Sequence, residues 1–122
     1  GTGVDPHLYK ASAGDVKKLS RAEIIFYNGL HLEGKITDIL AQMNKRGIFT
    51  VAVAERIDNS RLLTSEYFQG YYDPHIWFDV ILWKSAVEVV RDSLSKYDEK
   101  NKDVYFSNAE VYLKKLDELH RD

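Results

Sequence analysis

Apolar residues follow two different spacings along this chain, and together these spacings predict an α/β fold with a parallel sheet. Two short apolar runs, at 24–27 and 49–54, show no alternation with polar residues, which is typical of strands buried on both faces. Between them, apolar residues from Leu32 to Met43 recur at helical spacing, and Gly47 follows as a C-terminal cap. A strand, a helix and a second strand in this order predict a right-handed βαβ unit.

The remaining apolar periodicity predicts three more helices around this unit. Ser12 and Asp15 have the spacing of a capping box, which predicts a short helix over about 13–21. A long helix is predicted after Asp73, with that residue as N-cap and Pro74 at the first helical position. A last helix is predicted from about residue 103, and its apolar spacing continues to the end of the sequence. The two long stripes are Val80, Trp83, Ala86, Val87, Val89, Val90 and Leu94, then Tyr105, Ala109, Tyr112, Leu116 and Leu119. The polar stretch 57–72 predicts an irregular, mobile loop.

The composition is that of a folded domain, and it indicates neither nucleic-acid binding nor membrane binding. The 122 residues are 44% hydrophobic, enough for one core, and the net charge of −2 provides no basic surface for nucleic acid or anionic lipid. No apolar run approaches the roughly 18 residues of a membrane-spanning helix. Because the chain contains no cysteine, a metal site must consist of His, Asp and Glu, a set that suits zinc, manganese or iron rather than copper(I).

The tripeptide Asp-Pro-His occurs twice, at 5–7 and 73–75, and these units contain the only two prolines of the chain. Proline fixes its own φ and restricts the residue before it, so each unit presents its histidine from a stiff turn. Imidazole is the commonest protein ligand of transition metals, and a ligand gains from being fixed before the metal arrives. One such unit is most simply a surface turn, but its duplication makes His7 and His75 candidate metal ligands.

Further candidate residues lie near these turns in the sequence. Asp5 and Asp73 shape the turns, and together with Glu33 they are local options for completing a centre that needs about four donors. The other source of donors is a part of the protein outside this chain. Glu33 is otherwise an ordinary first-turn carboxylate. Asp79 either orients the second histidine or is an ordinary first-turn Asp favoured by the helix dipole. His31, after the first strand, either faces the same crevice or has no role.

Three motifs, in this order and at this spacing, resemble those of a known family. They are GVDPHLY at 3–9, IIFYNG at 24–29 with Leu32 and Glu33 behind it, and DPHIWFD at 73–79. Along essentially its whole length, the chain resembles the manganese- and zinc-binding solute-binding proteins of bacterial ABC importers, the cluster A-I or TroA-like group.

The resemblance implies a binding protein, not an enzyme, in which two α/β lobes joined by one long helix hold the metal between them. It implies that His7 and His75 are the ligands of the amino-terminal lobe, that His31 is not a ligand, and that the other lobe supplies a His or Glu and an Asp. Residues 1–102 then form most of the first lobe, without its opening strand, helix and second strand, and 103–122 start the linking helix. The implied function is extracytoplasmic delivery of Zn²⁺ or Mn²⁺ to an ABC permease. Any membrane attachment is implied to use a lipid anchor outside this chain.

Two other functions are compatible with these residues. A zinc metallohydrolase would hold a metal-bound water with His7, His75 and a carboxylate, using Glu33 as general base, although no H-E-x-x-H motif is present. Hydrolase turnover with added zinc separates it from a binding protein. A surface adhesin, a role given to some relatives, is neither favoured nor opposed by any residue. Every metal hypothesis requires the imidazoles to converge, with nitrogens roughly 3–4 Å apart on one ion, and a separation beyond about 12 Å excludes a shared site.

Overall fold

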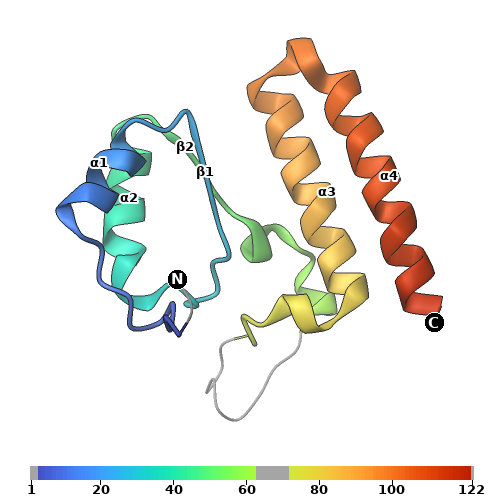
Figure 1. Ribbon diagram of the computed structural model, residues 1–122, viewed down its shortest axis with the longest axis horizontal. Coiled ribbons are helices and arrows are strands. Elements are labelled where there is room, and N and C mark those ends of the chain that lie inside the picture. Colours follow the sequence, from blue (N-terminus) through green and yellow to red (C-terminus); the bar gives the residue numbers. More distant parts are fainter. Residues whose placement is uncertain (1–2, 63–71, 122) are drawn as a thin grey trace.

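The computed structural model describes residues 3–62 and 72–121, and over these it has the predicted α/β architecture (Figure 1). Strand β1 (Ile24–Tyr27) pairs in parallel with β2 (Phe49–Ala52), with the first and last residues of the two strands in register. Helix α2 (Thr37–Lys45) connects the strands and completes the predicted βαβ unit. Every side chain of both strands is buried or half-buried, as their lack of polar alternation predicts.

Helices α1 (Ala13–Ser20) and α2 pack against one face of the sheet. The predicted capping box of α1 is confirmed, since Ser12 Oγ accepts from the Asp15 N–H at 3.1 Å and Asp15 Oδ2 accepts from the Ser12 N–H at 2.9 Å. The apolar faces of both helices meet β1 in a cluster centred on Ile25, Leu40 and Met43, with Val16, Leu19, Ile36 and Ile39 around it.

Helix α2 begins at Thr37, later than the apolar spacing from Leu32 predicts. Residues 29–31 have φ values of +84°, +52° and +67°, and a turn in the left-handed region cannot continue directly into a right-handed helix. Gly34–Ile36 then form a short 3-10 helix that leads into α2. The predicted end of the helix is confirmed, because Gly47 follows it with a φ of +94°.

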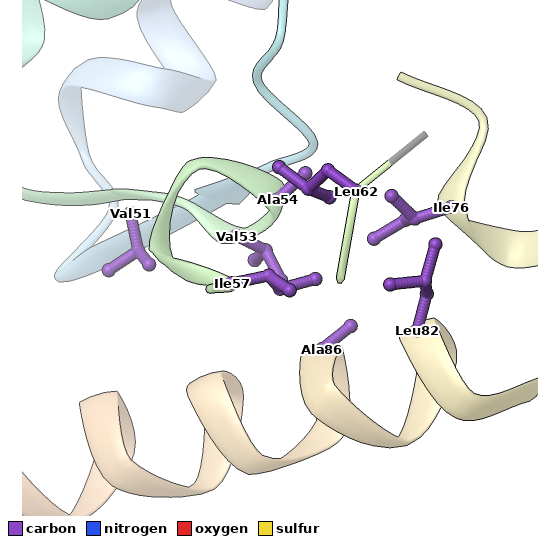
Figure 2. Packing of buried hydrophobic residues seen from close by; sticks show 8 residues of the cluster. All are labelled: Val51, Val53, Ala54, Ile57, Leu62, Ile76, Leu82 and Ala86. Atoms are coloured by element: carbon purple, nitrogen blue, oxygen red, sulfur yellow. The ribbon is translucent and has the colours of Figure 1, made fainter. Parts of the chain in front are cut away.

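The other face of the sheet packs against α3 (Val80–Tyr97). Strand β2 ends at Ala52 rather than at residue 54, because Val53–Arg56 turn into a short 3-10 helix whose apolar side chains stay in the core. Trp83, predicted in the apolar stripe of this helix, packs partly buried against the core. The core cluster between β2 and α3 consists of Val51, Val53, Ala54, Ile57, Leu62, Ile76, Leu82 and Ala86 (Figure 2).

The N-cap of α3 is Asp79, and the prediction that Asp73 is the cap is wrong. Asp79 Oδ1 accepts from two backbone N–H groups of the first helical turn, at 2.8 and 3.4 Å. The Asp73 carboxylate is engaged within its own turn, and Ile76–Phe78 form a 3-10 helix between that turn and α3. Pro74 therefore precedes the helix instead of occupying its first position. Of the loop predicted at 57–72, Asn59–Arg61 form a 3-10 helix and 63–71 lie outside the described residues.

Helix α4 (Lys102–Arg121), which the last apolar stripe predicts, runs back along α3 (Figure 1). Ala109 and Leu116 are its buried side chains, and Trp83 Nε1 of α3 donates to the Tyr112 hydroxyl at 3.0 Å. Within the two described ranges, no helix is both long and apolar enough to cross a membrane.

The junction between α3 and α4 is held by the Asp98 carboxylate. Asp98 Oδ2 accepts from the Tyr105 hydroxyl at 2.5 Å and from Asn101 Nδ2 at 2.8 Å. These hydrogen bonds, the one from Tyr105 first, lower the pKa of the Asp98 carboxyl below its ordinary value of 3.8. A carboxyl whose pKa is lowered by folding stabilises the fold above its unfolded pKa, and this stabilisation is lost as the pH falls through the lowered pKa.

We therefore expect Tyr105→Phe to lower the Tm near neutral pH and the deficit to shrink in acid. Thermal unfolding between about pH 7 and about pH 2 measures this difference. Tyr112→Phe is the matched control, because it removes a hydroxyl bonded to an indole N–H rather than to a carboxylate, so its effect should hardly vary with pH. A Tyr105→Phe deficit that persists unchanged in acid would contradict the role given to Asp98.

Candidate metal site

The two Asp-Pro-His turns lie side by side, although they come from distant parts of the sequence. The ring centroids of His7 and His75 are 6.1 Å apart, and the ring planes are inclined by 45°. Two imidazoles on one tetrahedral ion have centroids roughly 5 Å apart, so the separation of these rings is only slightly larger than in such a pair. The prediction that the two rings lie near each other, and not on opposite faces, is confirmed. Their side chains are 38% and 31% exposed, so an ion can reach them from solvent.

Each turn holds its histidine by the same pair of hydrogen bonds. Asp5 Oδ1 lies 3.0 Å from the backbone nitrogen of His7 and 3.0 Å from its ring Nδ1. Asp73 Oδ1 lies 2.9 Å from the backbone nitrogen of His75 and 2.7 Å from its Nδ1. The proline between them, with its fixed φ, brings each Asp side chain back over the histidine two residues later. The sequence-based role of Asp5 and Asp73 as shapers of the turns agrees with this geometry.

These hydrogen bonds determine which ring nitrogen is suited to bind a metal. An ionised carboxylate only accepts hydrogen bonds, so Nδ1 of each ring donates to its Asp. The hydrogen bonds from the His7 backbone N–H and then from its ring lower the pKa of the Asp5 carboxyl, which favours the ionised form. The neutral imidazole then carries its lone pair on Nε2. This is the carboxylate–histidine arrangement that orients many metal ligands.

Two aromatic side chains lie against His75. The Trp77 ring is edge-on to the imidazole at a centroid distance of 5.2 Å, and the Phe78 ring is stacked on it at 6.1 Å. Trp77 is 42% exposed and Phe78 is 80% exposed, so both rings reach solvent beside the imidazole. An apolar surround restricts the orientation of the imidazole and lowers the polarity next to a bound ion.

Two of the other candidate residues, Glu33 and Asp79, make structural hydrogen bonds. Glu33 Oε2 accepts from the Asn28 N–H at 2.7 Å and Oε1 accepts from the Gly29 N–H at 2.9 Å, so this carboxylate closes the turn after β1. Asp79 is the helix cap described above, and the carboxylate on Nδ1 of the second histidine is that of Asp73. His31 lies in the left-handed turn with an exposed side chain, and its role as a ligand stays untested.

Two further residues contact the turns and were missed by the sequence-based reasoning. Asn28 Nδ2 donates to the Pro74 carbonyl oxygen at 2.9 Å. Gly34 lies so close to the first turn that a Cβ on it would be 2.4 Å from the His7 carbonyl oxygen. The Asn-Gly pair after the first strand was the only available signal, and it indicated a turn but not what the turn would contact.

The described residues bring no third His, Asp or Glu ligand to the two imidazoles. Over residues 3–62 and 72–121, no group of three or more His, Asp or Glu side chains could hold one ion. A hollow of about 720 Å³ beside the site is lined by β1, α3 and α4, and none of the described residues lining it is His, Asp or Glu. An ion with four donors would need two more than these two imidazoles.

Comparison with known proteins gives consistent matches over the whole chain. The family model described as ZnuA, the periplasmic component A of a zinc-uptake complex, matches residues 1–122. The chain is 41% identical over 121 residues to the manganese-binding lipoprotein MntA of Bacillus subtilis (strain 168), covering 99% of this chain and 39% of that protein. It is 42% identical over 119 residues to the zinc-binding protein TroA of Treponema pallidum (strain Nichols), covering 98% of this chain and 38% of that protein. The chain thus spans about two fifths of the length of these relatives.

The fold matches as well as the sequence does. The structure of the periplasmic zinc-binding protein TroA from Treponema pallidum superimposes with a TM-score of 0.87 at 42% identity, over 96% of this chain and 41% of that one.

Proposed function

The chain belongs to the ZnuA family of periplasmic zinc-uptake components, and from this premise we propose that it carries the two-histidine half of a binding site for Zn²⁺ or Mn²⁺ in an ABC importer. The observation that carries the proposal is the convergence of His7 and His75, each oriented through Nδ1 by the Asp of its own turn. Neutral imidazole binds both ions, so the remaining donors decide between them. Relatives named for manganese and for zinc fit this division.

The remaining donors come, in this proposal, from a second lobe outside these residues. Residues 1–102 are the metal-binding lobe and 103–122 begin the helix that links it to the second lobe, an assignment supported by the length of α4 and by the short coverage of the relatives. The whole protein is extracytoplasmic and delivers the ion to an ABC permease, with membrane attachment through a lipid anchor outside this chain. Relatives named as lipoproteins support this part of the proposal.

A catalytic role has less support. The family is one of transport components, and the general base that a hydrolase would need, Glu33, has both carboxylate oxygens engaged by backbone N–H groups. We therefore assign the chain to metal binding without turnover.

The proposal predicts that one Zn²⁺ ion binds both histidines at once. In an NMR titration of the chain, the ring signals of His7 and His75 should shift together with a single dissociation constant and return when a chelator is added. His120, exposed on α4, is the internal control and should follow neither signal. Two ring signals that titrate with different constants, or shifts at His120 of the same size, would be evidence against a shared ion.

A further inference from the structure

The distance between the two imidazoles is not determined within the turns themselves. Each Asp orients only the ring of its own turn, and the turns are far apart in the sequence. A chelating pair must nevertheless be held at a defined separation, because a small misplacement of a ligand removes much of the benefit of preorganisation. Other parts of the fold must therefore hold the two turns relative to each other.

One end of the segment 28–34 contacts the second turn. The backbone of Asn28 is fixed at the carboxyl end of the sheet, since its carbonyl oxygen accepts from the Ala54 N–H at 2.8 Å and its N–H donates to Glu33. Its side-chain amide donates to the Pro74 carbonyl oxygen at 2.9 Å. Pro74 is fully buried, and this carbonyl belongs to the peptide that leads into His75. The Asn28 side chain thus links the sheet to the second turn.

The other end of the same segment contacts the first turn. Gly34 has a φ of +42°, and a Cβ there would lie 2.4, 3.1 and 3.2 Å from three backbone atoms of His7, which shows that the first turn rests directly on this glycine. Between the two ends, the carboxylates of Glu33 and Glu55 accept from the N–H groups of residues 28–30. The segment is therefore held as a unit by side chains of the lobe itself.

We propose that the segment 28–34 is a brace that sets the separation of the two imidazoles, with Asn28 and Gly34 as positioning residues for metal binding. The inference rests on the proposed function, because it concerns the same two histidines. The brace binds no metal itself. It acts by keeping the two rings at chelating distance before the ion arrives.

The test measures Zn²⁺ affinity of the chain by calorimetry in two matched pairs of variants. Asn28→Ala is compared with Asn44→Ala, which removes an exposed amide on α2, and Gly34→Ala with Gly47→Ala. The two glycines share a positive φ, but a Cβ at Gly47 meets nothing within 4 Å, so the second pair isolates the collision with the first turn. We expect each brace variant to bind Zn²⁺ about 10-fold to 100-fold more weakly than its partner, as for other residues that orient metal ligands.

A second readout separates positioning from a general loss of stability. When His75→Ala has already removed the chelate, Asn28→Ala should not weaken the residual Zn²⁺ binding any further. Equal affinities within both matched pairs, or the same loss from Asn28→Ala in both backgrounds, would overturn the brace. If His75→Ala itself leaves the affinity unchanged, then the proposed function fails instead.

Discussion

Replacing His7 or His75 with alanine should weaken Zn²⁺ binding at least about 100-fold. Residues that only orient a metal ligand already contribute about 10-fold to 100-fold in affinity, and a direct donor contributes more. With the rings 6.1 Å apart, each variant turns a two-point attachment into a one-point attachment. Calorimetry with Zn²⁺ on the folded variants gives the affinities directly.

The chain contains its own controls for this experiment, because it has two other histidines. His120→Ala, on the exposed surface of α4, should leave the affinity unchanged. His31→Ala tests the remaining sequence-based candidate, and the resemblance to TroA-like proteins implies no loss. The double variant should be hardly weaker than either single variant, since both side chains serve one ion. Additive losses would indicate two separate sites and would contradict the proposal.

Much of the fold could be predicted because local chemistry and burial agree. The apolar runs became the two parallel strands, and the Ser12–Asp15 capping box formed where its spacing placed it. The convergence of His7 and His75 could be predicted from the repeated tripeptide and the family resemblance together. For the strands and the cap short-range signals were sufficient, because no competing signal lay within a few residues, whereas the histidine pair needed the repeat and the resemblance.

The start of α3 could not be predicted because two local signals competed. Asp73 followed by Pro74 is a good N-cap pair, and Asp79 is an equally good cap. The choice depends on a tertiary arrangement, since the Asp73 carboxylate binds the ring and N–H of His75 while Ile76 enters the core. Sequence spacing alone contains no information about which Asp the histidine will engage.

The left-handed turn after β1 could not be predicted from the sequence for a different reason. Leu30 has a φ of +52°, a conformation that a bulky residue rarely adopts, and it is held there by Glu55 from a later segment of the chain. The bond from Asn28 to the Pro74 carbonyl likewise joins segments far apart in sequence. These long-range contacts hold the segments beside the two histidines in place, and only the folded structure shows them.

Ile76 anchors the second Asp-Pro-His turn in the hydrophobic core. Of the predictions made for this protein, its truncation should have the largest effect on the free energy of unfolding. Its side chain is 1% exposed, and Figure 2 shows it pointing toward Leu82 of α3 and Leu62. Ile76→Ala should lower the free energy of unfolding by about 2–5 kcal/mol, because it removes buried methyl groups and leaves a cavity that rigid neighbours only partly fill. Ile76→Val should cost only about 0.5–1.5 kcal/mol. Urea denaturation at 25 °C measures both values.

Phe78→Ala is the matched control, because it lies in the same 3-10 helix but is 80% exposed. Its free energy of unfolding should change by less than about 0.5 kcal/mol, although it removes a larger side chain. Ile76 directly follows His75, so Ile76→Ala should also weaken Zn²⁺ binding under conditions where the variant stays folded, whereas Ile76→Val should retain most of it. If Phe78→Ala proved as destabilising as Ile76→Ala, then burial in this cluster would not be what fixes the second turn.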